Sequence, residues 1–296
     1  MRRKHPWQWA AAIVLVLIVF LALRSLATNP NVDLPTIVKY LFDPLTLSGL
    51  GVTLALTVVS MVLGLAGGMV LAVMRLSGNV VLATMSRLYV WAFRAVPVLV
   101  QLIFWAYLGA LYAHITIGIP FTDIVLFSAR TSDVIGGTTA AILALGLSEM
   151  AYCAEIVRGG MLAIDRGQIE AAHSLAMSPG LTMRRIVLPQ AMRVIVPPLG
   201  NETINMVKLT SLVSVIAGAD LMTRLQTVYS QNFKVIPLLL VGSIWYLILI
   251  TLLSFPQAWL ERRYGRGVTA QRSPSWRSIV AWHHRRHAKR LKGATS

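Results

Sequence analysis

Two ionisable residues within apolar runs are the first features of this sequence that call for a chemical explanation. Glu149 lies in the run from Val134 to Val157, and Lys208 lies in the run from Leu199 to Leu221. A charge in hydrocarbon is costly, and such residues usually face a bundle interior or a water-filled path. Each lies about nine residues, or roughly 14 Å along a helix, from the polar segment 159–198. The two side chains are therefore expected at a similar depth.

The run that contains Lys208 also carries a polar stripe. Asn201, Asn205, Lys208 and Ser211 make up this stripe. Their spacing places them on one face of a helix, where they could line a cavity. Two interpretations fit these residues equally well. Either they and Glu149 contact the carboxylate and ammonium of a small polar solute, or they support the fold, through a buried ion pair of Glu149 and Lys208 or through hydrogen bonds between helices.

The composition predicts that these residues lie in a membrane. Of the 296 residues 56% are hydrophobic and 13% are charged, whereas soluble domains average about 25% charged residues. Six apolar runs exceed the roughly 20 residues that a helical span needs. They are Trp7–Ala27, Ser48–Met74, Leu88–Ala113, Val134–Val157, Leu199–Leu221 and Val235–Leu260. The sequence therefore predicts an all-α membrane protein with six transmembrane helices.

The distribution of basic residues predicts the orientation of these spans. The net charge of +16 lies mostly beside the apolar runs and in the C-terminal tail, which indicates membrane topology and not nucleic-acid binding. If the N-terminus is inside, Lys and Arg are four times more numerous in inside segments than in outside segments. The positive-inside rule then places both termini and segment 159–198 in the cytoplasm.

The first apolar run has two possible identities. The basic start MRRK and the small residues in Ser25-Leu26-Ala27 are compatible with a cleaved signal peptide. An uncleaved anchor is favoured, because the run is long, Arg24 precedes the potential cleavage site, and Trp7 and Trp9 suit an interfacial belt.

Two further features are predicted within the spans. Arg94 lies near the start of its span, where its side chain can extend to the cytoplasmic interface, and Pro97 is expected to kink the helix. Glu155 and Arg158 are three residues apart, so they are expected to form a local ion pair on one helix face.

The polar segment 159–198 is too amphipathic to be a simple tether. Residues 165–177 are predicted to form a helix that carries Ile169, Ala172, Leu175 and Ala176 on one face. Ser178 is predicted to cap a second helix with Pro179 in its first position, and Pro189 is expected to interrupt that helix. Such a segment on the cytoplasmic face is a surface on which another protein can dock.

The sequence of this segment resembles a known motif. Residues 170–180 read EAAHSLAMSPG and residues 186–193 read IVLPQAMR, which is similar to the cytoplasmic "EAA" loop of permease subunits in ATP-binding-cassette importers. The resemblance extends through VTLALTVVSMVLGLAGGMVLAVMRLS, YVWAFRAVPVLVQL, AEIVRGG and PPLGNETINMVKLTSLVSVI, and covers about residues 48–265. Together these motifs resemble the polar-amino-acid branch, which serves histidine, glutamine, glutamate, arginine and opines.

This resemblance implies three domains and a set of partners. Residues 1–47 would form an N-terminal anchor span and periplasmic loop, 48–265 a five-span permease domain, and 266–296 a basic cytoplasmic tail. In the bacterial inner membrane the chain would pair with a second permease subunit, identical or different, and receive solute from a binding protein. ATP and Mg would be bound by partner ATPase subunits, with no cofactor on this chain. Basic, acidic and amide amino acids all remain candidate solutes.

The resemblance also implies which residues contact the ATPase. The docking residues would be Glu170, Ala171, Ala172, Ser174, Leu175, Ala176, Met177 and Ser178. Two positions depart from the family pattern. Ala176 replaces a usual glycine, and an alanine held at positive φ would cost about 1 kcal/mol. The sequence Arg94-Ala95-Val96-Pro97 replaces the more usual Arg-Gly-Thr-Pro.

The chain itself is not expected to hydrolyse ATP or to act as an enzyme. A Walker A motif needs lysine after glycine, and no lysine in this sequence follows a glycine. His283, His284 and His287 lie among basic residues and do not form a metal motif. Trp276 and Trp282 instead favour contact of the tail with anionic lipid. The alternative function is a stand-alone secondary transporter or channel with a regulatory loop.

Overall fold

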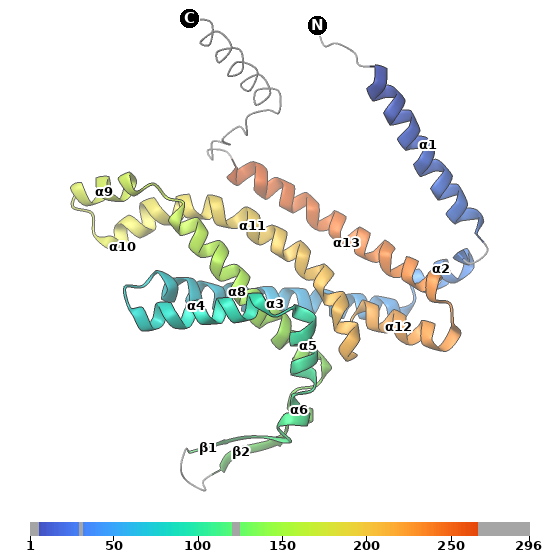
Figure 1. Ribbon diagram of the computed structural model, residues 1–296, viewed down its shortest axis with the longest axis horizontal. Helices are drawn as coiled ribbons and strands as arrows, with labels where there is room; N and C mark the ends of the chain where they lie inside the picture. Colours follow the sequence, from blue (N-terminus) through green and yellow to red (C-terminus); the bar gives the residue numbers. More distant parts are fainter. Residues whose placement is uncertain (1–5, 30–31, 120–124, 266–296) are drawn as a thin grey trace, which may run out of the picture.

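The computed structural model describes residues 6–29, 32–119 and 125–265, and it is mostly helical (Figure 1). The predicted basic tail, 266–296, lies outside the described residues. The first elements are α1 (Pro6–Thr28), α2 (Leu34–Leu41), α3 (Pro44–Leu76), α4 (Val80–Ala95), α5 (Val98–Ala106), α6 (Leu108–Leu111), β1 (His114–Gly118) and β2 (Val125–Arg130). They are followed by α7 (Thr131–Val134), α8 (Gly137–Leu162), α9 (Arg166–Ser174), α10 (Pro179–Thr182), a π-helical segment (Met183–Val187), α11 (Leu188–Leu209), a 3-10 segment (Thr210–Ile216), α12 (Leu221–Asn232) and α13 (Val235–Tyr264).

Three straight helices, α3, α8 and α13, are long and apolar enough to cross a bilayer. Two bent pairs add to them. The α4 and α5 pair is bent by 96°, and the Pro179–Ile216 helix meets α12 at 43°. Within the described ranges the candidate spans therefore number three, or up to five if each bent pair is one span. The predicted number of six is not confirmed within these ranges, where α1 contributes a shorter apolar helix, Ala11–Leu21.

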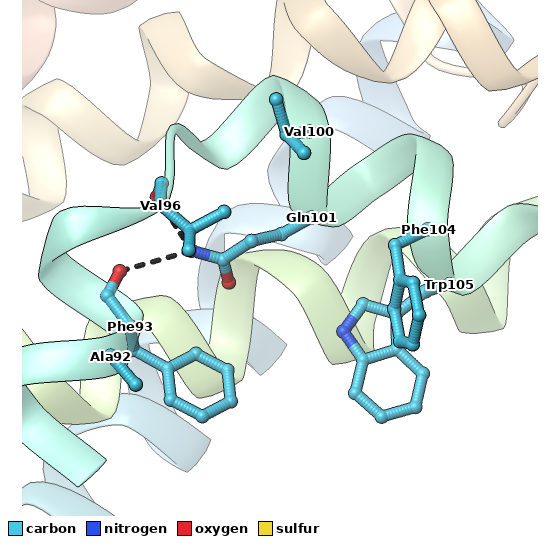
Figure 2. A pocket seen from close by; sticks show the side chains of 7 residues that line it. All are labelled: Ala92, Phe93, Val96, Val100, Gln101, Phe104 and Trp105. Atoms are coloured by element: carbon cyan, nitrogen blue, oxygen red, sulfur yellow. Dashed lines mark hydrogen bonds between the residues drawn. The ribbon is translucent and has the colours of Figure 1, made fainter. Parts of the chain in front are cut away.

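A sharp bend at Pro97 replaces the predicted continuous span Leu88–Ala113. Proline lacks an N–H and disfavours helical backbone at the preceding residue, and Val96 is extended at φ −87° and ψ 126°. The buried Gln101 side chain compensates, because its Nε2 donates to the carbonyls of Phe93 at 3.0 Å and Val96 at 2.9 Å (Figure 2). The expected kink is thus a turn of 96°. An apolar cavity of about 300 Å³ lies beside the bend, and Phe104 and Trp105 are among the residues that line it.

A two-stranded antiparallel hairpin interrupts the helical architecture. Strands β1 and β2 pair with His114 opposite Arg130, and the hairpin projects from the helices at the end remote from α9 (Figure 1). The prediction of an all-α fold is wrong for this segment. Its β-branched residues and Phe127 suit extended backbone better than a helix.

Close packing between α3 and α8 positions the buried carboxylate of Glu149. A Cβ added at Gly64 would lie 2.4 Å from Glu149 Cγ, and one added at Gly68 would lie 2.5 Å from Cys153 Cβ. Small residues four apart let two membrane helices approach closely. The core continues beside this contact, with Leu56, Leu102 and other buried apolar side chains of α3, α5, α8 and α11.

An ion pair joins α2 to the start of α13. Lys234 Nζ lies 2.5 Å from Asp33 Oδ2, and Asp33 also caps α2 by accepting from the Thr36 backbone N–H. The hydrogen bond from Lys234 lowers the pKa of Asp33 from 3.8 to about 2. A lowered carboxyl pKa contributes stability above pH 3.8, which is lost as the pH falls towards 2. The Asp33 carboxylate is therefore charged at every physiological pH.

Candidate functional site

A cavity of about 350 Å³ lies between α5, α8 and α11. Its polar lining consists of Ser148, Glu149, Tyr152, Glu202, Asn205 and Lys208. Its apolar lining consists of Val98, Leu145, Met206 and Leu209. The structure therefore brings together Glu149, Asn205 and Lys208, which come from helices far apart in the sequence. We call this space the charged cavity.

Two polar side chains of α8 that line the charged cavity, Ser148 and Glu149, are buried. The side chain of Glu149 is only 3% exposed, and its Oε1 accepts from Cys153 Sγ at 3.3 Å. The Ser148 hydroxyl is buried and makes no hydrogen bond within the described residues. A buried polar group without a partner is unfavourable unless a ligand or water satisfies it. The cavity thus offers both a carboxylate and an unsatisfied hydroxyl.

Lys208 lines the same cavity but is not paired with Glu149. In the described part of the chain, ion pairs within 4.0 Å join Glu155 to Arg75 and Arg158, and Asp33 to Lys234. The interpretation of Glu149 and Lys208 as a buried structural ion pair therefore finds no support in the geometry. The predicted local pair of Glu155 and Arg158 is confirmed, with 2.7 Å between its atoms.

Two members of the predicted polar stripe lie away from the charged cavity. Asn201 is exposed and does not line it. Ser211 falls after the last residue of α11, in the 3-10 segment, and its hydroxyl donates to the Lys208 carbonyl at 2.7 Å. The prediction of this stripe requires one continuous α-helix from Leu199 to Leu221. The Ser211 hydroxyl is therefore used by the helix backbone, and Ser211 is not part of the lining of the charged cavity.

Glu202 is a cavity residue that the sequence analysis missed. It lies on α11, three residues before Asn205, and therefore on nearly the same helix face. The signal was present, because Glu202 is a second ionisable residue within the run that contains Lys208. The predicted stripe does not include Glu202 and consists of Asn201, Asn205, Lys208 and Ser211. In the structure α11 begins at Leu188.

The predicted docking helix is formed by α9 and is shorter than expected. Asp165 caps its start by accepting from the Gly167 N–H at 2.7 Å, and it ends at Ser174, not at Met177. Ala176 then adopts φ 53°, which is the strained conformation considered for this alanine. The predicted cap of the next helix is confirmed, since Ser178 Oγ accepts from the Leu181 N–H at 3.4 Å.

The faces of α9 differ from the predicted pattern. Ala172 is 1% exposed and Leu175 is 77% exposed, so these two residues do not share one face. The early end of the helix at Ser174 explains the difference. Among the proposed docking residues, Glu170, Ala171, Ser174, Leu175, Ala176 and Ser178 are exposed. Ala172 instead anchors α9 to the rest of the chain.

Pro189 does not interrupt the following helix. The chain stays helical from Pro179 to Leu209 because a π-helical segment, Met183–Val187, precedes the proline. In this segment the Leu188 N–H donates to the Met183 carbonyl, five residues earlier. The wider turn relieves the clash between the proline ring and the preceding carbonyls.

Comparison with known proteins identifies the family of this chain. A family model described as binding-protein-dependent transport system inner membrane component matches residues 64–266. The chain is 42% identical over 267 residues to the arginine transport system permease protein ArgU of Corynebacterium glutamicum, covering 90% of this chain and 83% of that protein. It is 32% identical to the L-cystine transport system permease protein TcyB of Bacillus subtilis, over 78% of this chain and 92% of that protein.

Solved structures agree with this assignment. The chain resembles the crystal structure of an amino acid ABC transporter with histidines at a TM-score of 0.66 and 33% identity, over 78% of this chain and 98% of that one. A methionine ABC transporter in an inward-facing conformation matches at a TM-score of 0.54 and 21% identity, a likeness of fold alone. Because the family model covers most of the chain, the protein belongs to the family of binding-protein-dependent transport system inner membrane components.

Proposed function

We propose that this permease imports amino acids, and cationic amino acids in particular, through the charged cavity. The charge balance of the cavity carries the proposal. Glu149 and Glu202 supply two carboxylates, whereas Lys208 supplies one ammonium. A cationic amino acid has the complementary set of one carboxylate and two cations. Lys208 would bind the solute carboxylate, and the two glutamates would bind the α-ammonium and the side-chain cation.

The energy for import comes from outside this chain. Membership of the family makes the chain a non-catalytic transport component of the inner membrane, which disfavours the stand-alone transporter or channel. ATPase subunits would bind ATP and Mg and dock on the exposed part of α9. Their closure would move α9 and the attached α8, so that the cavity opens to each side in turn. A second permease subunit and a solute-binding protein would complete the complex.

The finer topology is also part of this proposal. Six spans are reached if α1 is an uncleaved anchor and each bent pair counts as one span. The domains would then be 1–47, 48–265 and 266–296. Both termini and α9 would lie in the cytoplasm, and the basic tail would contact anionic lipid. The positive-inside distribution of Lys and Arg supports this orientation.

Reporter fusions test the orientation. Fusions after Ser296 and within α9 are expected to report a cytoplasmic position, because both sites belong to the segments enriched in Lys and Arg. A fusion within the loop between β1 and β2 serves as the matched opposite case and is expected outside. A periplasmic signal from either of the first two fusions would overturn the six-span arrangement.

Uptake by the reconstituted complex tests the function. We expect liposomes that contain the permease, its ATPase subunits and its binding protein to accumulate arginine and lysine when ATP is supplied. Glutamine uptake is expected to be at least about tenfold slower, since losing one charge-assisted hydrogen bond costs about 1.5 to 3 kcal/mol. Glutamate should not be imported. Accumulation without ATP, or a preference for glutamate, would contradict the proposal.

A further inference from the structure

A second cavity lies on the same face of α8, closer to α9. It has a volume of about 600 Å³ and is lined by side chains of α3, α4 and α8. Glu149 lines the charged cavity, Tyr152 lines both cavities, and Glu155 lines the second one. These residues are spaced three apart, so each step advances about 4.5 Å along α8 towards α9. We call the second space the arginine-lined cavity.

Tyr152 forms the boundary between the two cavities. Within residues 6–29, 32–119 and 125–265 it is the residue shared by both linings. The guanidinium of Arg94 lies over its ring, with Cζ 5.2 Å from the ring centroid. This distance is within the range of a cation–π interaction, which holds the ring in one orientation. Arg94 thus contacts the boundary residue from α4.

The bend at Pro97 explains why α4 and α5 meet α8 at this level. Ala95, before the bend, lines the arginine-lined cavity, and Val98, after the bend, lines the charged cavity. Gln101 stabilises the bend through its hydrogen bonds to Phe93 and Val96 (Figure 2). The backbone therefore passes from one cavity to the other beside Tyr152.

The charges of the two cavities differ in sign. The arginine-lined cavity contains Arg75, Arg87 and Arg94 against the single carboxylate of Glu155, which is already paired with Arg158. A solute that leaves the charged cavity towards α9 would pass Tyr152 and enter a region of positive potential. There its carboxylate would be attracted, whereas its net positive charge would be repelled.

We propose that the Tyr152 ring, held by Arg94, is the barrier that closes the charged cavity on the side of α9. The inference rests on the proposed function, in which the charged cavity holds the solute. Opening would require the ring to leave its position beneath Arg94. Because Arg94 lies on α4 and Tyr152 on α8, a relative shift of these helices would separate the pair.

Thiol labelling in the assembled transporter tests the barrier. Cys153 is replaced by serine, and Asn205→Cys places one reporter in the charged cavity. A membrane-impermeant maleimide is added to inside-out vesicles, on the side of α9, without ATP. We expect Tyr152→Ala to raise the labelling rate at least about tenfold, because the ring no longer blocks the passage. Arg94→Ala should raise it several-fold, and Tyr152→Phe should leave it unchanged, since the ring remains.

Trp91→Ala is the matched control, because Trp91 lines the arginine-lined cavity and not the charged cavity. This variant should label at the parental rate. If the Tyr152→Ala variant does not assemble, the labelling rate of Arg94→Ala tests the barrier instead. Arg94 is exposed, so its truncation leaves no buried void. Equal labelling in the parent and in Arg94→Ala would overturn the barrier. Failure of the proposed function would appear separately, as normal arginine uptake by Glu149→Gln.

Discussion

Glu149→Gln is expected to lower ATP-driven arginine uptake by about 10- to 100-fold, because a hydrogen bond to a charged group contributes about 1.5 to 3 kcal/mol. Glu202→Gln and Lys208→Met should each have a similar effect, since each removes one of the three cavity charges. Assembly with the ATPase subunits and basal ATP hydrolysis should remain close to normal. Uptake, co-purification and hydrolysis are measured on the same preparations.

The three variants also separate solute binding from structural support. Asp133→Asn is the matched control, because Asp133 is an exposed carboxylate outside the cavity, and it should transport normally. If Glu149 and Lys208 were a structural pair, each single change would destabilise the complex by about 3 to 5 kcal/mol, with rescue in the double variant. We expect no such pattern in thermal unfolding. Normal uptake in Glu149→Gln and Lys208→Met would exclude the cavity as the solute path.

Leu175→Glu is expected to weaken association with the ATPase subunits by about 30-fold or more. Leu175 is apolar, 77% exposed and lies at the end of α9, and an interface anchor contributes about 2 kcal/mol or more. Glu170→Lys should weaken association to a smaller extent, because charges at an interface rim contribute less. Association is measured by titrating the purified ATPase against the permease in detergent.

The control for this experiment is Leu126→Glu. Leu126 is 69% exposed and lies on β2, at the end of the molecule remote from α9 (Figure 1), so its replacement should leave association unchanged. Ala172 is unsuitable as a test residue because it is buried, and a larger side chain there would displace α9 itself. Equal affinity of Leu175→Glu and the parent would show that α9 is not the docking surface.

The polar segment 159–198 illustrates what local sequence can predict. The predicted cap at Ser178 depends on one side chain and a backbone N–H three residues away, so residue type and spacing are enough to identify it. The end of α9 was predicted three residues too late, because the apolar pattern continues to Met177 although the helix ends at Ser174. The pattern alone does not reveal the left-handed backbone of Ala176.

The sequence by itself determined the membrane environment, the family, the amphipathic character of segment 159–198 and the expectation that Glu149 and Lys208 share a depth. These follow from composition, ordered motifs and helical rise, all of which are local properties. Only the tertiary structure decided which residues meet in the charged cavity. The Pro97 bend, the close approach of α3 to α8 at Gly64 and the start of α11 at Leu188 depend on contacts between distant segments. As a result, Glu202 lines the cavity and Ser211 does not. The direction of a side chain depends on where its helix begins, bends and ends.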